Sequence, residues 1–382
     1  MSQLGELIRQ LCPDGVEYRK LGDICSIEKG KTPIQKAVPG EYPLVVTADD
    51  RLSCNAYQFE GNAVCIPLIS SSGHGKKDLR TIHYQTGKFA LGNILCAVIP
   101  NDETQISARF LYVYLLAKKD FLIVPLMRGG ANVSLSTDLL KNVKVPIPPL
   151  EVQQEIVRIL DQFTELTAEL TAELTARKKQ YEYYRCKLLA SHRNSRLFLI
   201  SDLCKISRGR VISKDFIRDN GGKYPVYSSQ TENDGVLGLI NSYEYDGEYL
   251  TWTTDGANAG TIFYRKGQFN ITNVCGLLEV NQQLVLPRYL YYSLGNVSGN
   301  YVSKGMGNPK LMSNTMGRIK VYIPSLDEQR RIVSILDRFD ALCNDLTSGL
   351  PAEIEARKKQ YEYYRDKLLT FKEKSSDSSR GE

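Results

Sequence analysis

The chain has 382 residues, of which 42% are apolar and 24% charged, and this is the composition of a globular protein with two or three domains. No run approaches the ~18 consecutive apolar residues of a membrane-spanning helix, and the first residues lack the pattern of a secretory signal. The formal net charge of +6 permits nucleic-acid binding but does not require it.

The nine cysteines are scattered without a Cys-x-x-Cys pair, and the three histidines cannot complete a zinc framework. An odd, dispersed set of cysteines is typical of reduced thiols, so we expect a cytoplasmic protein that binds no metal. Cys25 and Cys204 occupy matching places in the two repeats described below, and we interpret both as small buried apolar residues.

Two stretches, about 20–145 and 200–321, contain short apolar and β-branched runs separated by clusters of Gly, Asn, Asp and Ser. This pattern is typical of strands joined by turns. One longer apolar segment in each stretch, ARFLYVYLLAKK and PRYLYYSLGN, predicts a short helix. We therefore expect two α/β or α+β domains with strand-rich cores.

Each stretch ends in Ile-Pro-x-Leu, at 147–150 and 323–326, and proline can open a helix. The next ~40 residues place apolar side chains at alternating steps of three and four, which predicts a coiled-coil helix about 60 Å long. Because such a helix needs a partner for its apolar seam, we expect the two copies to pack together. The seam residues predicted to form the helix or subunit interface are Phe163, Leu166, Leu170, Leu174, Tyr181, Tyr184, Phe339, Leu342, Leu346, Tyr361 and Tyr364.

The two helices differ in their middle parts. The first contains the array ELTAELTAELTA at 165–176, whose steps of four exceed the heptad average of about 3.5 and act as stutters. The second is four residues longer over this stretch and contains Gly349 and Pro351. A proline inside a helix removes a hydrogen bond, so the second helix is expected either to kink there or to end and restart.

The chain is a tandem repeat. Segments 176–189 and 356–369 share thirteen of fourteen residues, and other segments match in the same order at an offset of about 180, such as GKFALGN with GQFNITN and RFLY with RYLY. The helices are nearly identical and the globular parts are not. This indicates that the helices meet equivalent partners and the globular parts meet different ones, unless a recent partial duplication left the helices alike without a functional reason.

Catalytic motifs are absent from the sequence. Gly30-Lys31-Thr32 is similar to the end of a phosphate-binding loop, but Cys25 stands where that loop needs its first glycine. No Gly-x-Gly-x-x-Gly follows a strand, and no Asn/Asp-Pro-Pro-aromatic motif of an amino-methyltransferase occurs. His74 and His83 have no acidic or cysteine companions nearby. We therefore predict a binding protein rather than an enzyme.

Two globular domains alternate with two near-identical helices, each ending in KQYEYYR-x-KLL, and this arrangement resembles the specificity subunit of type I restriction–modification enzymes. The motifs that carry the resemblance are I-P-x-L-x-x-Q-x-x-I-V at 147–157 and 323–333, and ARKKQYEYYR with KLL at 176–189 and 356–369. The resemblance covers essentially the whole chain, and the repeated combination is more specific than any single motif.

The resemblance implies a mixed α+β fold, in which two strand-rich target-recognition domains are separated by two long antiparallel coiled-coil helices with a pseudo-twofold repeat. The expected boundaries are a first target-recognition domain at 1–146, a helical spacer at 147–190, a second domain at 191–322, a second spacer at 323–371 and a tail at 372–382. The Gly-Leu-Pro interruption of the second helix departs from strict symmetry.

The resemblance also implies partners. Each domain would read one half of a bipartite site on double-stranded DNA, and the helices would set the half-site spacing and dock two methyltransferase subunits. Restriction subunits would supply translocation and cleavage. S-adenosylmethionine, ATP and Mg would belong to those partner subunits, and this chain would bind no cofactor.

Reading DNA requires basic groups for phosphates and Asn, Gln, Arg, Ser or Thr for base edges. Lys29 and Lys31 in the first half match Arg208 and Arg210 in the second, which suggests a shared phosphate clamp. Loops rich in such residues supply the other candidates. They are Ser71, Ser72, His74, Lys76, Lys77, Arg80, Arg128, Asn132, Ser229, Gln230, Thr253, Thr254, Asn258, Arg265, Lys304, Asn308 and Lys310.

Some assignments stay open from the sequence. Trp252 fits either a core position or a base contact. Tyr181, Tyr184 and their repeats could stack on bases, but their spacing follows the seam and favours packing against a helix or a methyltransferase subunit. The alternative function is a non-catalytic scaffold whose two heads bind proteins, and a self-contained methyltransferase or nuclease would instead bind cofactor by itself.

Overall fold

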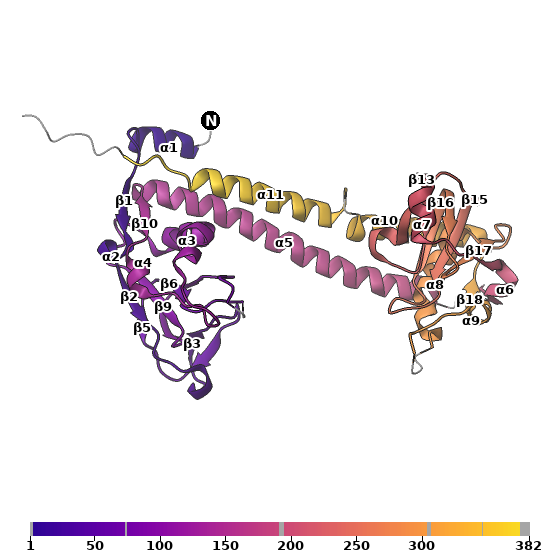
Figure 1. Cartoon of the computed structure of the whole chain (residues 1–382), viewed down its shortest axis with the longest axis horizontal. Helices are drawn as coiled ribbons and strands as arrows, with labels where there is room; N and C mark the ends of the chain where they lie inside the picture. Colours follow the sequence, from indigo (N-terminus) through magenta and orange to yellow (C-terminus); the bar gives the residue numbers. More distant parts are fainter. Residues whose placement is uncertain (1–2, 73–74, 191–194, 304–306, 346, 375–382) are drawn as a thin grey trace, which may run out of the picture. The chain divides into compact units, whose positions relative to one another are not determined.

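The computed structural model describes residues 3–72, 75–190, 195–303, 307–345 and 347–374 (Figure 1). The chain divides into two compact units, residues 1–169 with 354–382, and residues 170–353. Each unit therefore holds one globular part, the first half of the long helix that leaves it and the last half of the other long helix. The expected mixed α+β fold is confirmed.

The first unit contains two four-stranded sheets, in the orders β2-β9-β6-β7 and β4-β3-β8-β5, and the antiparallel ribbon β1-β10. Strands β6 and β9 are almost wholly buried, which explains their unbroken apolar sequences. The strands are β1 (Glu17–Lys20), β2 (Cys25–Lys29), β3 (Tyr42–Val45), β4 (Leu52–Cys54), β5 (Phe59–Glu60), β6 (Ala63–Pro67), β7 (His83–Gln85), β8 (Lys88–Leu91), β9 (Leu95–Pro100) and β10 (Lys144–Ile147).

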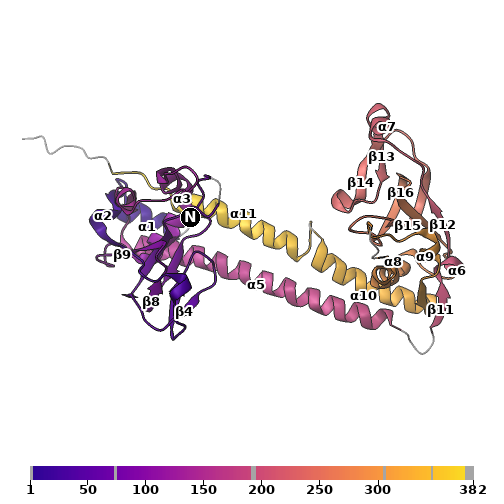
Figure 2. The same ribbon diagram turned by 60° about the horizontal axis from the view of Figure 1, so that its bottom comes forward.

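The second unit joins its strands into one six-stranded sheet, in the order β12-β17-β15-β16-β13-β14, beside the ribbon β11-β18. Figure 2 shows β13 and β14 at one end of this sheet. The strands are β11 (Arg196–Leu199), β12 (Cys204–Arg208), β13 (Gly221–Tyr227), β14 (Val236–Ile240), β15 (Tyr245–Thr253), β16 (Ile262–Ile271), β17 (Cys275–Val280) and β18 (Lys320–Ile323).

Helices cover the sheets and connect the two halves of the sequence. The two short helices expected from the apolar segments are present as α3 and α8, and α8 packs against α10. The helices are α1 (Gln3–Leu11), α2 (Leu21–Ile24), α3 (Ala108–Leu122), α4 (Thr137–Lys141), α5 (Leu150–Leu189), α6 (Ile200–Leu203), α7 (Lys214–Asp219), α8 (Pro287–Val297), α9 (Ser313–Gly317), α10 (Leu326–Asn344) and α11 (Leu350–Leu368).

The second long helix ends and restarts, which decides between the two expectations from the sequence. Helix α10 stops at Asn344, and Asp345 accepts hydrogen bonds from the backbone N–H groups of Thr347 (2.7 Å) and Ser348 (3.3 Å) before α11 begins. A Cβ at Gly349 would lie 2.5 Å from the carbonyl oxygen of Ala341, so this turn requires glycine. Pro351 lies in the first turn of α11, where its missing N–H costs no helical hydrogen bond.

Within each unit the two helix halves pack through the predicted seam. In the first unit Phe163 stacks on Tyr364 with ring centroids 5.5 Å apart, and in the second unit Phe339 stacks on Tyr184 at 5.8 Å. The start of α5 shares the first core with the end of α11, so the two helices run antiparallel there. Tyr184 and Tyr364 therefore pack against the neighbouring helix, and Leu346 lies outside the described residues.

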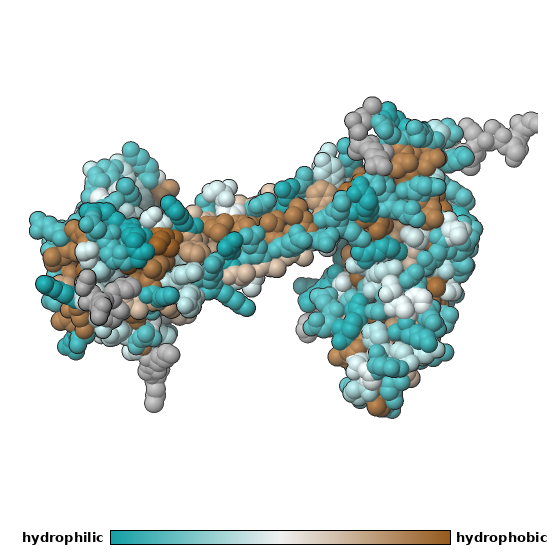
Figure 3. Space-filling model, turned by 180° about the vertical axis from the view of Figure 1, so that it is seen from behind, coloured by the Kyte–Doolittle hydropathy of each residue, from teal (hydrophilic) through white to brown (hydrophobic). Residues whose placement is uncertain are grey.

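Apolar side chains also follow the helices on the surface shown in Figure 3. They occupy a narrow stripe because the opposite faces of α5 and α11 carry Glu, Lys and Arg. In the part of the chain that the structure describes, no helix is long and apolar enough to cross a membrane.

Candidate nucleic-acid interface

In the first unit, the candidate cations lie at one edge of a sheet. Strands β2 and β6 both run antiparallel to β9, so their last residues, Lys29 and Pro67, meet at the same edge. The amide of Gln58 holds the chain as it leaves this edge, because it donates to the carbonyl oxygen of Lys29 (2.9 Å) and accepts from the N–H of Lys31 (2.8 Å). Both lysine side chains are left exposed.

Two loops that the sequence singled out meet beside this edge. Ile69 and Arg128 each form a β-bridge with Ser134, and the N–H of Ser70 donates to the carbonyl oxygen of Val133 at 2.9 Å. The Ser70 hydroxyl also donates to the carbonyl oxygen of Lys76 (2.6 Å), which closes the 70–80 loop on itself. The exposed candidates brought to this surface are Ser71, Lys76, Lys77, Arg80, Arg128 and Asn132, with Ser72 half-buried.

The second unit repeats this arrangement. Strands β12 and β15 both run antiparallel to β17, so their last residues, Arg208 and Thr253, meet at one edge. The loop after β15 joins the loop before α9, because Asp255 forms a β-bridge with Lys310. Asn258 reaches a third loop through a hydrogen bond from its amide to the hydroxyl of Thr231 (2.8 Å). Three candidate loops therefore meet at this edge.

The exposed candidates of the second unit are Arg208, Arg210, Asn258, Asn308 and Lys310, and Ser229 and Gln230 are half-buried. The Arg210 guanidinium forms an ion pair with Glu244, which offsets its charge. The candidates His74 and Lys304 lie outside the described residues.

For three residues of the second unit, the prediction of direct contact with DNA is wrong, because their side chains are buried. Thr253, Thr254 and Arg265 are buried with exposed fractions of 0%, 1% and 3%. The Thr254 hydroxyl donates to the carbonyl oxygen of Val274 (2.9 Å), so it shapes the loop from inside. The sequence predicts these side chains on exposed loops because the residues that bury them are distant in the chain and leave no local pattern.

Trp252 belongs to the core. Its side chain is fully buried, and its indole N–H donates to the carbonyl oxygen of Leu311 at 2.9 Å. A Cβ on Gly276 would lie only 2.2 Å from the indole ring, so the neighbouring strand needs glycine there. The tryptophan therefore holds the candidate loop before α9 against the sheet and is not available to a base.

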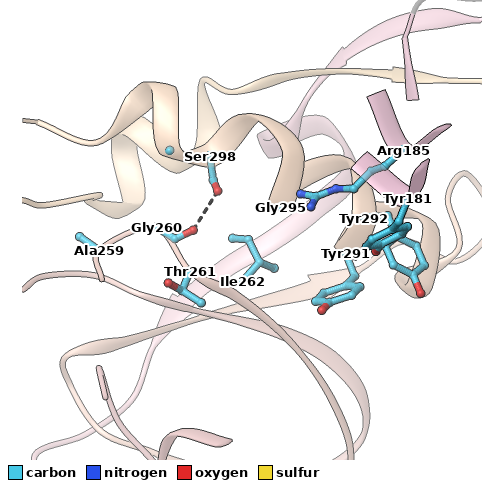
Figure 4. A pocket seen from close by; sticks show the side chains of 11 residues that line it. Tyr181, Arg185, Ala259, Gly260, Thr261, Ile262, Tyr291, Tyr292, Gly295 and Ser298 are labelled. Carbon is cyan, nitrogen blue, oxygen red and sulfur yellow. Dashed lines mark hydrogen bonds between the residues drawn. The ribbon is translucent and has the colours of Figure 1, made fainter. Parts of the chain in front are cut away.

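A hollow of about 360 Å³ lies between the candidate loops of the second unit and its helices (Figure 4). The backbone of residues 259–261 forms one side, and Ser298 secures it by donating to the carbonyl oxygen of Gly260 at 2.8 Å. Arg185, Tyr181 and Tyr291 form the other side. Burial raises the pKa of Tyr181 well above its ordinary range, so its hydroxyl stays protonated.

Each globular part is fastened to the start of its helix by a buried glutamine. Gln153 accepts from the N–H of Ser107 (2.9 Å) and donates to the carbonyl oxygens of Gln105 (2.7 Å) and Pro148 (2.8 Å). Gln329 does the same in the second unit with Leu286, Leu284 and Pro324. Both belong to the repeated I-P-x-L-x-x-Q motif, and that repetition was the available signal for their role.

An ion pair also joins each globular part to its long helix, and it was not predicted from the sequence. Arg109 of α3 contacts Asp161 of α5 at 2.6 Å, and Arg288 of α8 contacts Asp337 of α10 at 2.8 Å. Burial, and then a hydrogen bond to Asp337, raises the pKa of Tyr292 well above its ordinary range. The repeated segments RFLY and RYLY carried this signal.

The described residues contain no group of three His, Cys, Asp or Glu side chains that could hold a metal ion. Burial raises the pKa of Cys25 and of Cys204 to about 12, as expected for small apolar core residues rather than reactive thiols.

The family model and the similar proteins agree on one protein family. The model of the type I restriction modification DNA specificity domain matches residues 13–177 and again 193–356. A putative type I specificity subunit of Mycoplasma pneumoniae is 43% identical over 59% of this chain and 92% of its own length. A putative type I restriction enzyme specificity subunit of Haemophilus influenzae is 31% identical over 93% of this chain and 96% of its own length.

Solved structures share the fold. The S subunit of a type I restriction-modification system from M. genitalium superimposes with a TM-score of 0.63 at 16% identity, covering 93% of this chain and 96% of its own. The HsdS subunit from Thermoanaerobacter tengcongensis gives a TM-score of 0.51 at 16% identity, covering 94% of this chain and 97% of its own.

Proposed function

Because the chain belongs to the type I restriction modification DNA specificity family, we propose that it reads a two-part DNA site for such a complex, one part with each globular domain. The chain is a specificity subunit and is not itself an enzyme. Catalysis would come from methyltransferase and restriction subunits, which would also bind S-adenosylmethionine, ATP and Mg.

One observation carries this proposal, namely that each unit gathers basic and amide-bearing loops at the same edge of its sheet. The edge at Lys29 and Pro67 in the first unit corresponds to the edge at Arg208 and Thr253 in the second. Phosphate contacts need exposed cations, and base readout needs exposed polar side chains beside them. Both edges offer the two kinds of residue, and their sequences differ, as they should if they read different half-sites.

The helices support a second part of the proposal, that two identical methyltransferase subunits dock on them. Tyr183 and Tyr363 occupy equivalent positions, and each is 61% exposed. Each ring lies edge-on to the neighbouring tyrosine at 5.4 Å, with the cation of Lys187 or Lys367 5.8 Å from its centroid. Two exposed aromatic patches of the same construction fit two copies of one partner.

The proposal is tested by combining the chain with the methyltransferase subunit of its own system and mapping the methylated adenines on random-sequence DNA. We expect one bipartite site with a fixed gap, and binding that weakens steeply with salt because phosphate contacts release counterions. Methylation without a bipartite preference would refute the proposal.

The rival function, a scaffold whose two heads bind proteins, predicts a different result. Complexes would then form without DNA, and a gel shift with genomic DNA would show no sequence selectivity. The clustering of polar loops at both sheet edges favours DNA, because protein-binding faces are usually more aromatic and less charged at their centres.

A further inference from the structure

One loop occupies the same place in both domains. Residues 228–235 connect β13 to β14 in the second unit, and residues 46–51 connect β3 to β4 in the first. The strand before each loop contains Tyr-Pro, pairs antiparallel with the strand after the loop, and pairs parallel with β16 or β8. The two loops are therefore structural equivalents.

The loop of the second unit has an unusual backbone. Asn233 (φ 48°) and Asp234 (φ 51°) are the residues other than glycine with positive φ in the part of the chain that the structure describes, and Gly235 (φ 77°) follows them. Consecutive left-handed residues of this kind are unfavourable unless their surroundings hold them. The loop therefore has a defined shape that some other group must maintain.

Arg265 of β16 is that group. Its side chain is 2% exposed, and its Nη1 lies 2.6 Å from the Asp234 carboxylate while Nη2 donates to the Asp234 carbonyl oxygen at 2.8 Å. Its guanidinium lies 3.6 Å from the ring centroid of Tyr227 and its Nε donates to the hydroxyl of Thr251. A buried cation with so many partners fixes Asp234 in one position.

In the first unit the residue at the equivalent strand position also contacts the loop, but the arginine lies in the loop and not in the strand. Gln85 precedes the shared Gly-x-Phe segment by the same number of residues as Arg265 does in the repeat, 180 residues later. Here the loop supplies the arginine, because Arg51 donates from Nε to the Gln85 side-chain oxygen at 3.1 Å. Arg51 also contacts Nδ1 of His83 at 3.3 Å. Both domains thus fasten the equivalent loop at the equivalent strand position.

The fastened loop presents free polar groups beside the candidate edge. Glu232 and Asn233 are exposed, and among the described residues neither side chain makes a hydrogen bond or ion pair. The loop reaches the edge through the hydrogen bond between Asn258 and Thr231. Asn can bond adenine with two hydrogen bonds and Glu can accept from the cytosine amino group, whereas a carboxylate repels phosphates. Such a loop suits base edges rather than the DNA backbone.

We propose that residues 230–234 of the second domain and 47–50 of the first are base-reading loops, and that Arg265 and Arg51 are the positioning residues that set them. This inference rests on the proposed function and names the elements that determine each half-site. Because the contacts of each arginine lie within its own unit, each should control only its own half of the DNA site.

The test uses the chain combined with its methyltransferase subunits and sequences the methylated products from a randomised DNA library. Arg265→Gln should relax base preference in the half-site of the second domain, with selectivity falling on the order of tenfold to a hundredfold. The half-site of the first domain and the gap between them should not change. Arg51→Gln should produce the reverse pattern.

A matched control is available at the next residue. Lys266 is exposed and paired with Glu248 at 3.2 Å, so Lys266→Gln removes the same charge from the same strand without touching the loop. It should leave both half-sites unchanged. If Arg265→Gln does not fold, Asp234→Asn decides the matter, because Asp234 is 71% exposed and its replacement keeps the core intact.

The outcomes separate this inference from the proposed function. If the unmodified chain yields no bipartite site, the proposed function fails. If it yields one, but Arg265→Gln, Asp234→Asn and Asn233→Ala all leave the half-site of the second domain unchanged, only the loop assignment fails. Equal loss at both half-sites would show that the arginine acts on stability alone, which also overturns the assignment.

Discussion

The buried glutamines show how a single side chain joins a domain to its helix. Gln153 satisfies one N–H and two carbonyl groups at the point where α5 begins. Buried polar groups left without partners cost more than an ordinary hydrogen bond contributes. The repeated glutamine is therefore needed for packing and not for chemistry.

We predict that Gln153→Ala lowers the free energy of unfolding of the first unit by about 2–4 kcal/mol, because three buried backbone groups lose their partner. Urea unfolding followed by circular dichroism measures this change. The neighbouring Gln154 is exposed, so Gln154→Ala serves as the control and should change stability by less than about 0.5 kcal/mol. Equal effects of the two variants would contradict the role assigned to Gln153.

The environment of His83 predicts that the stability of the first unit depends on pH. Burial, and then the nearby charge of Arg51, lowers the pKa of His83 below its ordinary value, although Asp49 and a backbone contact to Val46 act in the opposite direction. Between the lowered pKa of the folded state and the ordinary pKa, His83 is therefore protonated in the unfolded chain but neutral in the folded chain. Stability from this group is complete above the unfolded pKa of about 6.5 and is lost as pH falls below it.

We expect the melting temperature of the chain to fall between about pH 7.5 and about pH 5.5 more steeply than that of His83→Gln, which cannot take up the proton. Differential scanning calorimetry at several pH values measures the two slopes. Parallel slopes would show that carboxylates, and not His83, account for the acid sensitivity.

At the scale of the element, the two copies of the long helix differ in continuity. Helix α5 continues through its tetrad array without a break, whereas α10 ends and α11 restarts after a turn that Asp345 caps. Hydrogen bonds from Ser348 and Thr347 lower the pKa of Asp345 well below its usual range. The four additional residues of the second copy are therefore taken up in the turn instead of in a longer helix.

The tetrads predict how the site spacing can be altered. One additional ELTA unit after Ala176 lengthens α5 by about 6 Å and rotates the remainder of the helix by about 40°. At roughly 3.4 Å per base pair, the preferred gap between half-sites should change by one or two base pairs while both half-sequences stay the same. Mapping of methylated adenines measures the gap. An unchanged gap, or an altered half-sequence, would rule out a helix that sets spacing.

At the scale of the molecule, the segment after α11 contacts the residue before β1 through hydrogen bonds, although the two are at opposite ends of the sequence. In the second unit β11 follows α5 along the chain, but in the first unit the segment after α11 meets the start of β1 through hydrogen bonds to Val16. The N–H of Val16 donates to the carbonyl oxygen of Lys372, and the N–H of Lys374 donates to the carbonyl oxygen of Val16, both at 2.9 Å. The segment after α11 thus takes the place of a linker.

This contact predicts that a circular permutant is functional. Joining residue 382 to residue 1 through a flexible linker, and opening the chain between Leu189 and Arg196, preserves every element of both units. The permutant should methylate the same bipartite site at a rate within about threefold of the original, since opening a chain between secondary-structure elements is usually tolerated. Opening the chain inside β16 instead is the control and should abolish folding. Loss of one half-site in the first permutant would contradict this prediction.

Much of this protein was predictable from local patterns. The tandem repeat, the apolar seam of the helices and the motifs of the specificity family are all readable because they depend on residue order and spacing, and the Gly-Leu-Pro interruption marked the helix break correctly. The short helices in each domain were expected from their apolar segments as well. These features follow from backbone periodicity, which the sequence expresses directly.

Only the tertiary structure decided which polar residues face outward and which halves of the helices belong together. Arg265, Thr253 and Thr254 look like surface loop residues in the sequence, but residues far away in the chain bury them. The end of α11 joins the first domain, from which it is distant in the sequence, because its apolar side chains complete that core. Burial results from such long-range packing, and no local pattern records it.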